Sequence, residues 1–97
     1  MTLRTLTDVV DALRPRLREE FNVAALYVFG SVARGEARET SDVDLLVEFQ
    51  GQATFAAFMD LKALLEDTLG VRVDLVTRAA LRPRLRPQIE AEAQRVA

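Results

Sequence analysis

Three acidic residues, Asp42, Asp44 and Asp74, are the first candidates for chemistry because they lie in strand-like apolar segments. Side chains two positions apart in a strand project from one face, so Asp42 and Asp44 point the same way. Asp74 lies in a second alternating stretch, residues 71–76. If the two strands are neighbours, the carboxylates converge and repel unless a cation compensates. Oxygen ligands alone favour Mg²⁺ over zinc.

A pair of small residues upstream of these aspartates predicts a place for phosphate. Gly30 and Ser31 follow an apolar run that ends at Phe29. Glycine allows a ligand to approach the backbone closely, and a helix beginning at Ser31 would point free N–H groups at an anion. The ordinary alternative is that Ser41 and Asp42 form a turn and that the other aspartates are solvated.

The composition excludes several other chemistries. The 97 residues contain no cysteine and no histidine, so thiolate nucleophiles, histidine bases and Cys/His zinc sites are ruled out. The formal net charge of −2 argues against a nucleic-acid-binding polycation. No apolar run reaches transmembrane length. We expect one domain over residues 1–97, soluble and cytoplasmic, with no membrane contact and no direct nucleic-acid binding.

The elements that must position these residues follow from hydrophobic periodicity. A helix is expected over residues 6–21, with Thr7 or Thr5 as its N-cap and Pro15 producing a kink rather than a break. Thr54 caps a second helix that Gly70 ends. Strands are predicted over residues 24–29, 43–49 and 71–76. The order is that of one α/β unit.

The tail after Thr77 contains Pro83 and Pro87 and predicts an irregular turn, then a short helix, with a strand possible at the end. Its apolar residues suit packing onto something other than its own sheet, and these are Leu81, Leu85 and Ile89. Phe55 and Phe58 on the long helix are expected in the core, with a partner surface as the alternative.

Gly30-Ser31, ten intervening residues and Asp42-Val43-Asp44 match the pattern G-S-x₁₀-D-x-D. This pattern resembles the signature of the DNA polymerase β-like nucleotidyltransferase superfamily. The stretch FGSVARGEARETSDVDLLVEF looks like its minimal nucleotidyltransferase branch, and the resemblance covers nearly the whole chain. It implies a nucleotidyltransferase fold of the α/β (α+β) class, with a small mixed sheet of three to four strands and helices packed on one face.

The resemblance also implies a role for each of the three aspartates. Asp42 and Asp44 would bind a pair of Mg²⁺ ions, and Asp74 would complete the metal site and help to activate the acceptor hydroxyl. Two metals would bridge the attacking and leaving oxygens of an in-line displacement. No residue has the character of a covalent nucleophile, so we expect a direct transfer.

Four further residues are implied at the nucleotide. Gly30 and Ser31 would hold the β- and γ-phosphates of ATP. Arg34 is either a phosphate contact or a surface arginine, and Ser41 either touches the nucleotide or orients its turn. Glu36 and Arg38 are interpreted as solvated loop charges.

The function implied by the resemblance is that of an antitoxin in a toxin–antitoxin pair. Members of this branch transfer AMP from ATP to a tyrosine hydroxyl of a HEPN toxin partner. Two alternatives remain: a catalytically weak toxin-binding module, and the catalytic subunit of a split enzyme that modifies small molecules such as aminoglycosides. Because so small a chain leaves the site open, a partner or a second copy in a homo-oligomer would build its missing wall.

Overall fold

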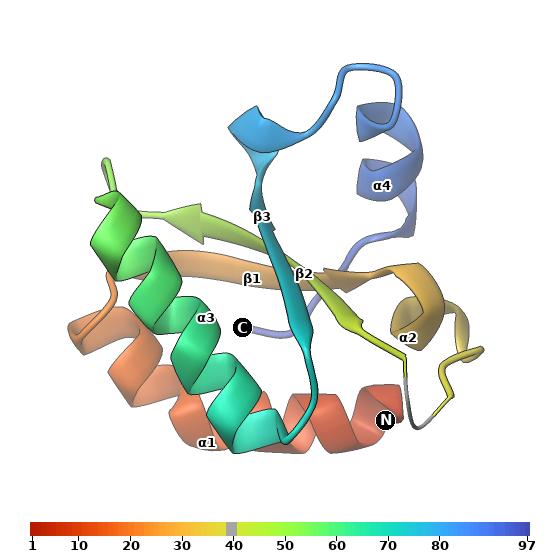
Figure 1. Cartoon of the computed structure of the whole chain (residues 1–97), viewed down its shortest axis with the longest axis horizontal. Coiled ribbons are helices and arrows are strands. Elements are labelled where there is room, and N and C mark those ends of the chain that lie inside the picture. Colours follow the sequence, from red (N-terminus) through yellow and green to blue (C-terminus); the bar gives the residue numbers. More distant parts are fainter. Residues whose placement is uncertain (39–40) are drawn as a thin grey trace.

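The structure, a computed structural model, describes residues 1–38 and 41–97. Helices alternate with strands along most of the chain (Figure 1). In chain order the elements are α1 (Leu3–Glu19), β1 (Val23–Phe29), α2 (Gly30–Arg34), β2 (Val43–Phe49), α3 (Phe55–Leu69), β3 (Val73–Thr77), a 3₁₀ turn η1 (Arg78–Ala80), α4 (Arg86–Glu92) and β4 (Gln94–Arg95). The tail therefore forms both the short helix and the terminal strand that the sequence allowed.

The strands form one mixed sheet in the order β3-β2-β1-β4. β1 pairs antiparallel with β2 and with β4, whereas β2 and β3 are parallel. Parallel neighbours need a crossover connection, and α3 provides it. The fold class expected from the sequence, with a small mixed sheet and helices, is confirmed.

The main core lies between the sheet and its two long helices, α1 and α3, which share one face (Figure 1). Alternation in β2 sends Val43, Leu45 and Val47 into this core, and each is at most 1% exposed. The helices contribute fully or nearly fully buried side chains, namely Leu6, Val10, Leu13, Leu17, Leu61 and Leu65. The even-numbered residues of β2, including Asp44, therefore face the other side.

A second, smaller cluster covers part of that other side. Leu81 from the tail packs with Phe29 and Leu46, and Ile89 from α4 lies against them. The expectation that the tail packs away from its own sheet is wrong for Leu81 and Ile89, because Leu46 and Phe29 need an apolar cover. Leu85 alone stays 47% exposed.

Helix ends agree with the sequence-based prediction for α3 and differ for α1. Thr54 Oγ1 accepts a hydrogen bond from the Ala57 N–H at 3.0 Å, and Gly70 is left-handed, as expected. The prediction of Thr5 or Thr7 as the N-cap of α1 is wrong, since Thr2 Oγ1 accepts from the Thr5 N–H at 3.1 Å. Pro15 lies inside α1, which continues past it and is not split.

Phe55 corrects a further expectation. It is the first residue of α3 and is 78% exposed, so it is not part of the core, whereas Phe58 packs against the core from its edge. Across the described residues, the helices are too short or too polar to traverse a bilayer.

Candidate active site

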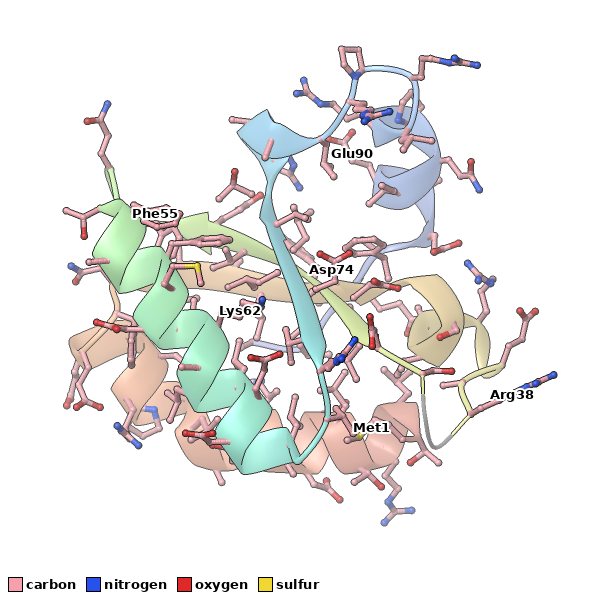
Figure 2. The ribbon with its side chains drawn as sticks, in the orientation of Figure 1. Met1, Arg38, Phe55, Lys62, Asp74 and Glu90 are labelled. Carbon is pink, nitrogen blue, oxygen red and sulfur yellow. The ribbon has the colours of Figure 1, made fainter. Side chains whose placement is uncertain are left out.

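Asp44 and Asp74 are paired directly across the parallel strands β2 and β3. Partners in register share a face of the sheet, so both carboxylates lie on the face opposite α1 and α3. Asp42 immediately precedes β2 and, two residues from Asp44, lies on the same side. Figure 2 shows Asp74 among the strands, away from Phe55 at the start of α3. The sequence-based expectation that the two strands are neighbours is confirmed.

Asp44 has an unusual environment for an acid. Partial burial is the first cause that raises its pKa, to about 6, and the negative charges of Asp74 and Asp42 add to the shift. Arg34 opposes it. A carboxylate whose charge is disfavoured in this way gains from any cation that comes within reach.

Gly30 lies against the Asp44 carboxylate. It begins α2 with φ +72°, and a Cβ placed there would overlap Asp44 Oδ2. Two requirements therefore select glycine at position 30: the left-handed backbone and the absence of a side chain where the carboxylate lies. This explains physically why Gly30 and Asp44 belong to one motif although fourteen positions separate them.

Arg34 and Glu92 complete one side of the site. The Gly30 N–H donates to Glu92 Oε1 at 2.5 Å, and Arg34 Nη1 donates to both carboxylate oxygens of Glu92 at 3.1 and 3.0 Å. Glu92 first, and then Glu36, raise the pKa of Arg34. Sequence reasoning missed Glu92, which comes from α4 and reaches Gly30 across 62 positions. No spacing rule connects residues so far apart.

The remaining candidates are placed near this group but bond within the chain. Ser31 is half-buried in the first turn of α2. The Ser41 hydroxyl accepts a hydrogen bond from the Arg38 N–H at 3.0 Å, so it orients the local backbone. Glu36 is 66% exposed, as expected of a solvated charge, and it also pairs with Arg34 at 3.2 Å. Contacts of Ser31, Ser41 and Arg34 with a nucleotide stay predictions.

The carboxylate oxygens of Asp42, Asp44 and Asp74 are ligands of the kind that Mg²⁺ prefers. Within residues 1–38 and 41–97, no three acidic side chains lie close enough together to hold an ion on their own. Proteins bind Mg²⁺ beside nucleotides through one or two carboxylates, with phosphate oxygens and water completing the shell. The Asp44–Asp74 pair and its raised Asp44 pKa match that arrangement, and metal binding by Asp42, Asp44 and Asp74 together stays a prediction.

A large hollow lies elsewhere on the molecule. It is an open groove of about 880 Å³ at the far ends of β2 and β3, and Phe55, Phe58 and Arg78 are among its lining residues. Its acid, Glu48, is already paired with Arg78. This groove does not include Asp44 or Asp74, and Asp74 is exposed on the edge strand β3.

Comparison with known proteins agrees with this geometry. Residues 10–96 match the nucleotidyltransferase domain family. The chain belongs to that family. The protein adenylyltransferase MntA of Thermococcus cleftensis is 44% identical to this nucleotidyltransferase domain over 82 residues, which cover 84% of the chain and 83% of the relative. The activity class inferred from the motif, nucleotidyl transfer, is thereby confirmed.

Solved structures agree on the fold. One that is provisionally described as a minimal nucleotidyltransferase superposes with a TM-score of 0.82 at 48% identity, over 97% of this chain and 95% of the other. A chain from the complex of the tri-AMPylated HEPN toxin of Shewanella oneidensis with its MNT antitoxin has a TM-score of 0.68 at 21% identity. That alignment covers 100% of this nucleotidyltransferase domain and 72% of the other chain, and it shows a shared fold.

Proposed function

We propose that this nucleotidyltransferase transfers AMP from Mg²⁺-bound ATP to a tyrosine hydroxyl of a HEPN toxin and thereby acts as an antitoxin. The observation that carries the proposal is the in-register pair Asp44–Asp74, with Gly30 fitted against Asp44. A pure binding module has no use for repelling carboxylates on one surface, because they destabilise the fold until a cation arrives. A metal-dependent transferase needs them.

Three aspartates would bind the metal, and one of them would also act on the acceptor. Asp42, Asp44 and Asp74 would hold Mg²⁺, which when bound polarises the phosphate oxygens and favours an ionised acceptor. Asp74, exposed at the edge strand β3, would take the proton of the acceptor hydroxyl. The hydroxyl oxygen then bonds to the α-phosphorus, while the bond from that phosphorus to the bridging oxygen breaks. Pyrophosphate leaves and AMP remains on the acceptor.

Gly30, Ser31 and Arg34 would bind the β- and γ-phosphates beside Asp44. Arginine matches phosphate with its planar donors, and Arg34 already lies close enough to lower the pKa of Asp44. Because charge stabilisation and alignment supply most of the rate in phosphoryl transfer, the chain needs no covalent nucleophile.

The protein acceptor is supported by the open site and by the relatives. Asp74 is exposed on the edge strand β3, so a folded partner can bring its hydroxyl to this carboxylate and exclude water. MntA is named a protein adenylyltransferase, and the Shewanella oneidensis antitoxin is held in a complex with an AMPylated HEPN toxin. The same acceptor class is proposed for this chain.

The test is transfer of label from α-phosphate-labelled ATP. The protein is incubated with Mg²⁺ and a purified HEPN toxin, and mass spectrometry locates any added AMP. We expect mass increments of AMP on a toxin tyrosine and none with an Asp42→Ala/Asp44→Ala variant. A toxin Tyr→Phe variant at the labelled position should remain unmodified.

Two other outcomes would replace the proposal. Neutralisation of the toxin by the double Asp→Ala variant, without any label, would establish a binding module. Binding of Mg²⁺–ATP together with label on an aminoglycoside, and none on protein, would establish a small-molecule transferase.

A further inference from the structure

Glu92 occupies the donors that the triphosphate needs. Its carboxylate accepts from the Gly30 N–H at 2.5 Å and from Arg34 Nη1 at 3.0 Å. These are the donors next to Asp44, where the phosphates of a metal-bound nucleotide must lie. Carboxylate and phosphate oxygens compete for the same kind of donor, since both are anionic acceptors that match an arginine.

We propose that Glu92 is a built-in anion that fills the phosphate position of the nucleotide-free enzyme and must leave it before the triphosphate binds. This inference rests on the proposed function. A backbone N–H carries one hydrogen, so Gly30 serves either Glu92 or a phosphate oxygen. Arg34 is likewise engaged on both sides, by Glu92 and by Glu36 at 3.2 Å.

The environment of Glu92 argues that its contact is built by the fold. Its side chain is only 19% exposed, and its charge adds to the forces that raise the pKa of Asp44. The backbone is held on both sides of it: Leu81 is 8% exposed in the smaller cluster, and Val96 is 4% exposed in the main core. The buried residues on both sides therefore hold this segment in place, with Glu92 next to Gly30.

Because the backbone is anchored, opening requires rotation of one side chain only. The glutamate turns toward solvent, the Gly30 N–H and Arg34 become available, and the triphosphate takes the vacated positions. While the carboxylate stays in place it also repels the incoming phosphates. Glu92 therefore lowers the affinity for ATP and leaves the affinity for AMP, which has no β- or γ-phosphate, unchanged.

The experiment is a calorimetric titration of the full chain with Mg²⁺–ATP and with AMP. Glu92→Gln keeps the shape and removes the charge, and Glu92→Asp keeps the charge but is one methylene too short to reach. We expect both variants to bind Mg²⁺–ATP about tenfold more tightly than the natural chain, the worth of roughly one charged hydrogen bond. Glu90→Gln, on the same helix and paired with Arg78, is the charge-matched control and should stay within about twofold.

A second readout is the amide proton of Gly30, followed by NMR. Its resonance in the natural chain should shift when Mg²⁺–ATP is added, because the Glu92 carboxylate leaves. It should also differ between the natural chain and the Glu92 variants without nucleotide, because the variants lack that contact.

Equal or weaker binding of Mg²⁺–ATP by both Glu92 variants, with the natural chain still binding, would overturn the inference and leave the proposed function standing. Absence of binding by every protein, the natural chain included, would overturn both. Melting curves of the variants separate a folding defect from either result.

Discussion

At the scale of single residues, the site depends on the fit between Gly30 and the Asp44 carboxylate. Any side chain at position 30 meets Asp44 Oδ2, and it does so on a left-handed backbone that disfavours side chains. Two separate costs therefore accompany one substitution. Gly35 separates them, because it has the same φ of +72° and a Cβ added there would meet nothing within 4 Å.

Gly30→Ala and Gly35→Ala should each lose about 1–2 kcal/mol of unfolding free energy from backbone strain. Only Gly30→Ala also displaces Asp44, so it alone should lose nucleotidyl transfer, by tenfold or more. Urea denaturation and the labelled-ATP assay measure the two effects. Full activity in Gly30→Ala would show that the position of Asp44 is not critical.

The raised pKa of Asp44 predicts an unusual pH dependence of stability. Between about pH 4, where an unfolded aspartate ionises, and about pH 6, the folded state holds a proton that the unfolded state has lost. Stability contributed by this group is therefore greatest below pH 4 and falls as pH rises through 6. Asp44→Asn should lack this fall and be more stable than the natural chain at pH 7.

The measurement is urea unfolding at pH 4.5, 5.5 and 7 in the absence of divalent ions, with the Asp44→Asn variant as reference at each pH. Mg²⁺ competes with the proton, so Mg²⁺–ATP affinity should weaken below about pH 6. If the unfolding free energies of the two proteins depend on pH in the same way, the pKa of Asp44 is not raised.

At the scale of elements, the position of Asp74 depends on how the edge strand β3 is held. The Val73 N–H donates to Glu66 Oε2 at 3.0 Å, so the end of α3 fixes the start of β3 one residue before Asp74. Helix and strand are thereby joined by a side chain as well as by the turn between them.

Glu66→Ala leaves that N–H without its partner and should cost about 1–2 kcal/mol, with reduced transfer because Asp74 is less firmly placed. Glu66→Gln retains an oxygen acceptor and should recover most of both. Unfolding and labelling assays on the two variants decide whether stability and transfer depend on the hydrogen bond to Val73 or on a general effect of changing the surface of α3. A Glu66→Gln variant as damaged as Glu66→Ala would point to charge instead.

Local rules predicted β2 and α3, but they misplaced the N-cap of α1, where three threonines compete and Thr2 is the cap. Alternation identified β2, and Thr54 with Gly70 identified α3, because capping and patterning are local. The pairing of Asp44 with Asp74 followed once the strands were taken as neighbours. The contact of Glu92 with Gly30 and the packing of the tail over Leu46 were not predictable. Both depend on where the tail folds back onto the sheet, and the local sequence pattern of the tail does not specify that position.

At the scale of the whole molecule, the repelling carboxylates lower the stability of the nucleotide-free protein. If the proposed function is right, a bound cation with its nucleotide restores that stability. At a concentration one hundred times its Kd, Mg²⁺–ATP should raise the free energy of unfolding by about 2.7 kcal/mol.

The shift is measured by thermal or urea unfolding with and without Mg²⁺–ATP. Asp42→Asn/Asp44→Asn should be more stable than the natural chain without nucleotide and gain almost nothing when it is added. A gain equal to that of the natural chain would remove these aspartates from the binding site.

The parallel register of β2 and β3 has one more consequence. The pairing that buries Leu45 against Leu75 is the pairing that brings Asp44 beside Asp74. A slip by one residue would turn the apolar side chains to water and the aspartates into the core. A molecule with a slipped register thus loses its site and exposes its interior together, so cellular quality control that degrades misfolded chains also removes this form of inactive enzyme.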